Sequence, residues 1–267
     1  MFDITATIVL YKTDRDELLG AINSFLNCEK NVHLYLVDNS PTDCLKDFIC
    51  DERVEYKYVG KNLGYGAAHN LVLKSIVGKS KYHLVLNPDI FFEKGTLEVL
   101  FKYMEEHLDV GYCTGDIIKP SGERQYACRL LPTPATLLFR RLSPFSKLSH
   151  DAFEQYSFDK PINVPWSYGC FMFIRTDILC EVGFFDTRFF MYCEDVDFAR
   201  RIHSKYKTIY YPNVKIIHDS HRESSKNLSM FFIHISSAIK YFNKWGWFID
   251  KERDVVNEST LKELAVT

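Results

Sequence analysis

The sequence predicts an α/β fold, in which a mainly parallel central sheet is flanked by helices and followed by a C-terminal helical extension. In the first half of the chain, short apolar runs rich in β-branched residues alternate with segments whose apolar residues have helical spacing. Clusters of Asn, Pro, Asp and Gly separate these segments, as is typical of turns. Parallel strands need long crossover connections, so strands separated by helices of this length favour βαβ units.

Each expected element follows from its own pattern. Strands are expected over 4–10, 32–37, 54–59 and 83–86, and helices over 14–27, 67–75 and 94–107. Thr42 or Asp43 can cap a further short helix that ends at Cys50. The Pro-rich stretch 119–165 interrupts the alternation, and a last strand ends at His218.

Composition bounds the class of protein. The chain has 267 residues, of which 46% are hydrophobic and 25% charged, so it can bury a sizeable core and intrinsic disorder is excluded. The net charge of −2 gives no support to a nucleic-acid partner. The eight cysteines form no Cys-x-x-Cys pair, which disfavours zinc and redox motifs. No signal peptide and no apolar run of about 18 residues is present, so we expect a cytoplasmic protein that can still attach peripherally to a membrane.

Two polar clusters follow expected strands. Asp38 and Asn39 come directly after the second strand, where a carboxylate and an amide can bind a nucleoside or form an Asx turn. Asn87 and Asp89 follow the fourth strand, where oxygen ligands suit a hard divalent cation, although Asn-Pro-Asp is also good turn chemistry. Both interpretations stay open for each cluster.

A glycine-containing loop precedes the second long helix. Its sequence, residues 62–70, reads NLGYGAAHN. Gly64 and Gly66 allow a close backbone approach to a ligand before a helix N-terminus, which favours phosphate. The loop is neither a P-loop nor a complete dinucleotide motif, so on its own it is a weak signal.

Three carboxylates lie within four residues after an aromatic run. Glu194, Asp195 and Asp197 are costly to bury unless they are paired or used, and crowding raises carboxylate pKa values as a general base requires. Acidic residues are also favoured at a helix N-terminus, and the two interpretations are compatible. His218 ends a later strand, and a nearby metal site would give it a role.

Taken in this order, the motifs resemble those of the inverting GT-A glycosyltransferases of family 2, and particularly the bacterial rhamnosyltransferases of O-antigen and related polysaccharide synthesis. The resemblance extends from about residue 5 to residue 247. It is most specific in NLGYGAAHN, in LNPDI, and in SYGCFMFIR followed by GFFDTRFFMYCEDVDF. It implies a Rossmann-like GT-A domain over 1–230, with a donor half of about 1–118 and an acceptor half of about 119–230.

The resemblance also implies roles for individual residues. Asp195 matches the catalytic base, with Glu194 beside it, and Asp89 and His218 match residues that hold Mg²⁺ or Mn²⁺ or the diphosphate. The residues assigned to donor binding are Asp38, Asn39, Asn62, Gly64, Gly66, Asn70 and Asn87. Asn87 departs from the first acid of the family's Asp-x-Asp motif, which leaves the tightness of metal binding open. Acceptor contacts are assigned to Trp166, Gly169 and Arg222.

The implied substrates are a nucleotide sugar, with dTDP-β-L-rhamnose preferred, and a saccharide acceptor linked to polyprenyl diphosphate. Three alternatives remain in view: another nucleotide hexose such as UDP-galactose or UDP-glucose, a nucleotidyltransferase, and a non-catalytic sugar-binding protein. The segment 11–14 contains no glycine, which disfavours the nucleotidyltransferase. Retention of Glu194, Asp195 and Asp89 disfavours the non-catalytic protein.

The tail over 231–267 begins with an amphipathic helix. Its apolar stripe comprises Phe231, Ile235, Ala238, Ile239 and Phe242, and Lys240, Lys244, Trp245 and Trp247 add basic and indole groups. Residues 199–253 hold 11 Lys and Arg against 4 Asp and Glu. The helix either packs on the sheet with its tryptophans in the core or docks on an anionic membrane surface.

Overall fold

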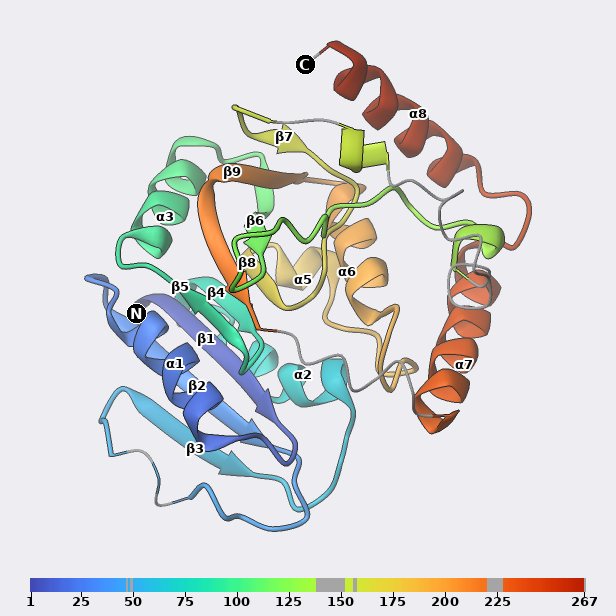
Figure 1. The fold of residues 1–267 in the computed structure, drawn as a ribbon. Helices are drawn as coiled ribbons and strands as arrows, with labels where there is room; N and C mark the ends of the chain where they lie inside the picture. The colour runs from blue at the N-terminus through green and yellow to red at the C-terminus, as the bar shows by residue number, and fades with distance from the viewer. Residues whose placement is uncertain (47, 49, 138–151, 156–157, 220–227, 267) are drawn as a thin grey trace.

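The computed structural model describes the chain apart from residues 47, 49, 138–151, 156–157, 220–227 and 267 (Figure 1). Its strands are β1 (Phe2–Leu10), β2 (Val32–Asp38), β3 (Val54–Tyr58), β4 (Ser80–Leu86), β5 (Ile90–Phe92), β6 (Val110–Ile118), β7 (Ile162–Asn163), β8 (Phe171–Arg175) and β9 (Lys207–His218). Its helices are α1 (Arg15–Leu26), α2 (Tyr65–Ile76), α3 (Thr96–Glu106), η2 (Ala152–Gln155), α5 (Leu179–Val182), α6 (Glu194–His203), α7 (Leu228–Trp245) and α8 (Lys251–Val266). The α/β class is confirmed.

The first half of the chain has the predicted geometry. β1 pairs in parallel with β2 and β4, and β2 pairs in parallel with β3. α1 begins after Asp14, whose side chain accepts hydrogen bonds from the backbone N–H groups of Asp16 and Glu17. The carboxyl ends of β1, β2 and β4 therefore meet at one edge of the sheet.

The second half departs from the prediction of a mainly parallel sheet. The strand order is β3-β2-β1-β4-β8-β6-β9-β5, with β7 paired to β9. β8 runs antiparallel to β4 and β6, and β5 and β7 run antiparallel to β9, so the sheet is mixed. The long stretch 119–170, which includes η2 and β7, connects β6 to β8, and a connection of this length can join two strands in either direction.

A second expectation is also wrong. The described residues between Thr42 and Cys50 contain turns and no helix. Lys46 N–H bonds to the Asp43 carbonyl and Phe48 N–H to the Leu45 carbonyl, which are single bonds between residues three apart. Capping residues alone do not offset the cost of nucleating so short a helix.

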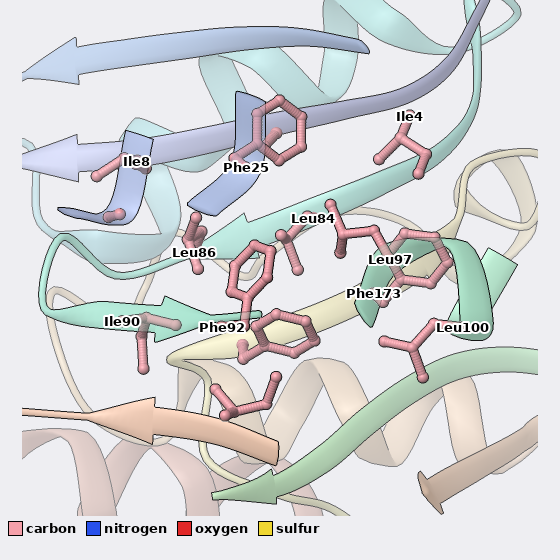
Figure 2. Close-up of a cluster of buried hydrophobic side chains, with 14 of the residues drawn as sticks. Ile4, Ile8, Phe25, Leu84, Leu86, Ile90, Phe92, Leu97, Leu100 and Phe173 are labelled. Atoms are coloured by element: carbon pink, nitrogen blue, oxygen red, sulfur yellow. The ribbon is translucent and has the colours of Figure 1, made fainter. Parts of the chain in front are cut away.

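Hydrophobic side chains cover both faces of the sheet. Figure 2 shows one cluster, in which side chains of β1, β4, β5 and β8 meet those of α1 and α3. The other cluster joins the opposite face to α2, α5, α6 and α7. Burying one such Leu, Ile or Phe stabilises the fold by about 1.5–3 kcal/mol. These two clusters hold the sheet between helices and so keep in place the sheet edge on which the candidate site lies.

The C-terminal helices pack on this core. Ala238, Tyr241 and Phe242 of α7 are buried, and Trp245 and Trp247 are partly buried against the same cluster. Of the expected stripe, Ala238 and Phe242 thus pack in the core, Phe231 and Ile235 are partly buried, and Ile239 is 41% exposed. None of the helices in the described part of the chain is long and apolar enough to cross a membrane.

A buried ion pair fastens these helices to α6. Arg200 places its two Nη atoms 2.7 Å from the two carboxylate oxygens of Asp250, and its guanidinium lies 4.1 Å from the ring of Trp245. Arg200 also donates to the Tyr241 hydroxyl at 3.3 Å. These contacts of Arg200 thus attach the chain after residue 230 to α6.

Candidate active site

Asp38, at the carboxyl end of β2, is buried and anchored on both oxygens. Oδ1 accepts a hydrogen bond from Ser40 N–H at 2.8 Å, and Oδ2 accepts one from the Tyr56 hydroxyl at 2.6 Å. The Asx-turn interpretation is therefore confirmed. Asn39 donates from Nδ2 to the Gly64 carbonyl at 3.2 Å, and its buried Oδ1 has no partner among the described residues. That orphaned amide oxygen can accept a hydrogen bond from a ligand.

The glycines of the 62–70 loop serve close packing between backbone segments. Gly64 has φ +84°, and a Cβ there would lie 2.2 Å from the Phe190 carbonyl oxygen. A Cβ on Gly66 would lie 2.8 Å from the Cβ of Phe185. Asn62 caps the loop by accepting from Gly64 N–H at 3.0 Å. Both glycines thus bring the start of α2 against the 185–190 segment.

Asn70 is placed differently from its assignment. Its Nδ2 donates to the Phe185 carbonyl at 2.8 Å, and its Oδ1 accepts from Phe185 N–H at 3.0 Å. The side chain is buried, and both of its polar atoms are engaged with the protein backbone. Asn70 therefore links α2 to the segment before α6, and both polar atoms of its side chain are directed to Phe185 rather than to a nucleotide sugar.

Asp89 and His218 come together as predicted. β5 pairs with β9 so that Ile90 lies opposite His218, and His218 Nε2 lies 3.2 Å from Asp89 Oδ2. Gln125 lies beside the ring, with Oε1 3.2 Å from Nδ1. The other oxygen of Asp89, Oδ1, is buried and has no partner among the described residues.

This pair fits a divalent cation in part. An unpartnered carboxylate oxygen beside an imidazole is a suitable donor set for Mg²⁺ or Mn²⁺. Within the described ranges there is no group of three His, Cys, Asp or Glu side chains that could hold a metal ion. Remaining ligands would have to come from water and from substrate oxygens, as is common for Mg²⁺ bound with phosphates.

Tyr65 links two parts of the site and was missed by the sequence analysis. Its hydroxyl lies 3.0 Å from Asn87 Oδ1 and 2.7 Å from the Gly169 carbonyl oxygen. Gly169 N–H in turn donates to Asp195 Oδ2 at 3.1 Å. A Cβ on Gly169 would lie 2.9 Å from the Cβ of Asp195, so the glycine is required for this approach. Gly169 thus holds Asp195, whereas it was predicted to contact the acceptor.

The three clustered carboxylates have different surroundings. Asp197 is fully buried and lies 3.0 Å from Arg201 and 2.5 Å from Lys244, and it accepts from the Trp245 indole at 2.9 Å. It is therefore a structural ion-pair centre. Glu194 is buried, and its Oε2 has no partner among the described residues. Asp195 alone of the three keeps partial exposure.

Glu194 and Asp195 titrate together. Burial raises the pKa of Asp195, while the N–H groups of Val196 and Gly169 oppose that rise. Burial, and next the charge of Asp195, raises the pKa of Glu194 well above its usual range. Burial and crowding thus raise the basicity of the pair, and Asp195 is its partly exposed member.

The backbone that precedes this pair is strained. Tyr192 and Cys193 have φ values of +69° and +67° although neither is glycine. Such conformations cost of order 1–3 kcal/mol each and persist only where surrounding contacts impose them. They turn the chain sharply into α6, and so determine where Glu194 and Asp195 begin the helix.

The other two residues assigned to acceptor binding have different outcomes. Trp166 is only 7% exposed and donates its indole N–H to the Leu130 carbonyl at 2.9 Å, so it is a core residue. Arg222 lies outside the described residues. Tyr168 is partly exposed near this position, and its hydroxyl accepts from Arg129 Nη2 at 2.7 Å.

Comparisons with known proteins find a matching family and similar sequences. The model for glycosyl transferase family 2 matches residues 5–183. Rhamnosyltransferase WbbL of Escherichia coli K12 is 24% identical over 245 residues, which are 88% of this chain and 91% of that protein. The N-acetylglucosaminyl-diphospho-decaprenol L-rhamnosyltransferase of Mycobacterium tuberculosis is 26% identical over 215 residues, which are 72% of this chain and 68% of that protein.

Solved structures agree on the fold. GalNAc-T7 with UDP, GalNAc and Mn²⁺ superposes with a TM-score of 0.63 at 14% identity, over 83% of this chain and 44% of that one. The mannosyltransferase PcManGT of Pyrobaculum calidifontis, in complex with GDP-Man and Mn²⁺, gives 0.58 at 14% identity, over 90% of this chain and 64% of that one. Because the family model matches well over half of the chain, this protein belongs to glycosyl transferase family 2 and resembles its rhamnosyltransferases.

Proposed function

We propose that the protein is an inverting glycosyltransferase that moves L-rhamnose from dTDP-β-L-rhamnose onto a saccharide linked to polyprenyl diphosphate. The observation that carries the proposal is the exposure of Asp195: of the three carboxylates that begin α6, it alone is partly exposed. The rhamnosyltransferases among the relatives support the sugar, and the printed name of the mycobacterial relative supports a diphospho-prenol acceptor.

In this mechanism Asp195 takes the proton of the acceptor hydroxyl. The acceptor oxygen forms a bond to the anomeric carbon of the donor sugar, while the bond from that carbon to the diphosphate oxygen breaks. The thymidine diphosphate leaves with the electron pair, and a single displacement inverts the anomeric centre. General-base assistance of this kind typically contributes about 10²–10⁴-fold to the rate.

Donor binding is proposed for the carboxyl edge of the sheet. Asp38 and the free oxygen of Asn39 would contact the base and ribose, and Asp89 and His218 would hold Mg²⁺ or Mn²⁺. When bound, the cation supplies positive charge that neutralises the diphosphate leaving group. Asn87, with Oδ1 next to the Tyr65 hydroxyl, would keep the turn that carries Asp89 in place.

A different donor is the second candidate, because one relative is a hexosyltransferase of Haloferax volcanii, 25% identical over 203 residues. Release of nucleoside diphosphate, measured with dTDP-rhamnose, UDP-glucose and UDP-galactose at equal concentrations, distinguishes the two. We expect the highest kcat/KM with dTDP-rhamnose. A clear preference for either UDP sugar would refute the rhamnosyl proposal and retain the glycosyltransferase.

Access to a lipid-linked acceptor would be aided by exposed apolar side chains on α7 and after it. Phe232 is 66% exposed and Phe248 is 86% exposed, and Leu228 and Ile249 are also largely exposed. We propose that this surface contacts the inner leaflet of the cell membrane. Co-sedimentation with anionic vesicles at low salt should fall in the variant Phe232→Ser/Phe248→Ser. Equal sedimentation of the variant and the wild-type protein would refute the contact.

A further inference from the structure

One face of α7 binds the segment that precedes the proposed base, residues 186–193, which we term the 186–193 loop. Ser237 Oγ donates to the Met191 carbonyl at 2.7 Å. Lys240 Nζ donates to the Arg188 carbonyl at 2.8 Å, and Lys244 lies 2.9 Å from the Asp186 carboxylate. These α7 residues are three and four positions apart, so they lie on one helix face.

The opposite side of the 186–193 loop rests on α2. Tyr65 N–H donates to the Phe190 carbonyl at 2.9 Å, and Gly64 permits this contact because any side chain there would meet the same carbonyl. The loop is therefore held between the N-terminus of α2 and the polar face of α7. It ends in the left-handed residues Tyr192 and Cys193, whose conformation needs such external support.

The geometry explains how α7 can influence Asp195 without touching substrate. Met191 is four residues before Asp195, and only the strained pair and Glu194 separate them. Gly169 N–H holds the Asp195 carboxylate from the other side at 3.1 Å. A shift of the 186–193 loop would therefore move the start of α6 relative to Gly169 and weaken this hydrogen bond.

We propose that Ser237 and Lys240 are positioning residues for the base, acting through the backbone carbonyls of Met191 and Arg188. The inference rests on the proposed role of Asp195. It places part of the catalytic apparatus in α7, a helix that lies beyond residue 183, where the family match ends.

The first test uses two neighbouring serines. Ser237→Ala removes the hydroxyl that binds Met191, whereas Ser236→Ala changes an exposed residue of the same helix. We expect Ser237→Ala to lower kcat by about 10- to 100-fold, the range seen when a supporting partner of an active-site group is removed. The KM for the nucleotide sugar should stay unchanged, and Ser236→Ala should keep wild-type kcat.

The pH profile supplies a readout that general destabilisation would not move. Gly169 N–H lowers the pKa of Asp195, so weakening that bond raises it. The acid limb of kcat/KM should therefore move to higher pH in Ser237→Ala. Lys240→Met should show the same shift to a smaller degree, and Lys240→Arg, which keeps a donor, should restore the wild-type limb. Lys240 is exposed, so these two variants decide the question if Ser237→Ala does not fold.

A double-mutant cycle separates this inference from the proposed function. If Ser237 acts through Asp195, Ser237→Ala lowers kcat no further in an Asp195→Asn background. An additive loss would overturn the inference, as would wild-type kcat and pH profile in folded Ser237→Ala and Lys240→Met. Full activity of Asp195→Asn alone would instead overturn the proposed base, whatever the serine variants do.

Discussion

The two sides of the candidate site are built in different ways. On the donor side, Asp38 and Asp89 follow directly from the ends of β2 and β4, whose register in a parallel sheet places them at one edge. On the base side, Asp195 follows a left-handed turn that α2 and α7 hold from both sides. A regular element thus positions the first set, and contacts between remote segments position the second.

This difference predicts that the base side is the more sensitive to single substitutions. A strand end is defined by many ladder hydrogen bonds, so the loss of one side chain leaves its neighbours in place. The strained turn before α6 depends on a few specific hydrogen bonds, so the loss of one of them should shift its backbone.

The largest effect is expected for Asp195→Asn. The amide retains the shape of the side chain but cannot take the acceptor proton, so kcat should fall about 10²–10⁴-fold while donor binding remains. Steady-state release of nucleoside diphosphate together with nucleotide titration measures both quantities. Glu194→Gln is the matched control, because Glu194 is buried whereas Asp195 is partly exposed, so this variant should lose much less activity. The reverse ranking of the two variants would assign the base to Glu194.

A somewhat smaller loss is expected on the donor side for Asp89→Ala. Removing the carboxylate that would hold the cation should lower kcat/KM about 10²–10³-fold, the range for losing a group that stabilises transition-state charge. Excess chelator should abolish activity in the wild-type protein, and added Mg²⁺ or Mn²⁺ should restore it. Undiminished turnover in chelator would show that no divalent metal is needed and would leave Asp89 a structural partner of His218.

Sequence reasoning succeeded where a functional residue adjoins a regular element. The helix that begins at Glu194 and the strand that ends at His218 were both predicted, and the pairing of β5 with β9 brings His218 to Asp89 as expected. Tyr65 escaped notice because its partners Asn87 and Gly169 lie 22 and 104 residues away, and no local pattern marks such contacts.

The polar face of α7 escaped notice for a related reason. The helix was analysed for its apolar stripe, and Lys240 and Lys244 were interpreted as basic groups for a membrane surface. Their contacts with the 186–193 loop, and that of Ser237, appear only when the loop is placed against the helix. The mixed sheet was missed because the apolar sequence of β8 fits a buried strand whether it runs parallel or antiparallel to its neighbours. Strand direction depends on the route of the connecting chain, which composition does not reveal.

Tyr65 gives an intermediate prediction that compares the two sides directly. Tyr65→Phe removes the hydroxyl next to the Asn87 side chain and the Gly169 carbonyl, and should lower kcat about 10-fold or more with little change in donor KM. Tyr56→Phe removes a hydroxyl of the same kind from Asp38 and should raise donor KM instead. Identical kinetic changes in both variants would contradict a division of roles between the two sides.

The smallest effect concerns the stability contributed by a buried residue of α2. His69 is fully buried between Tyr65 and Phe185, and both of its ring nitrogens lack partners among the described residues. Burial lowers the pKa of His69 well below its ordinary 6.5. Below pH 6.5 the unfolded chain therefore binds a proton at this position that the folded protein does not. Folding stability falls as pH falls, by about 1.4 kcal/mol per pH unit for one such group.

The variant His69→Phe isolates this contribution. The raised pKa values of Glu194 and Asp195 act in the opposite direction, because the folded protein then binds the additional protons, so the wild-type slope alone is not diagnostic. His69→Phe keeps an aromatic ring against Tyr65 and removes the titration. Urea unfolding at pH 7, 6 and 5 should show the variant gaining stability over the wild-type protein as pH falls. A constant difference between wild type and His69→Phe across this range would refute the assignment.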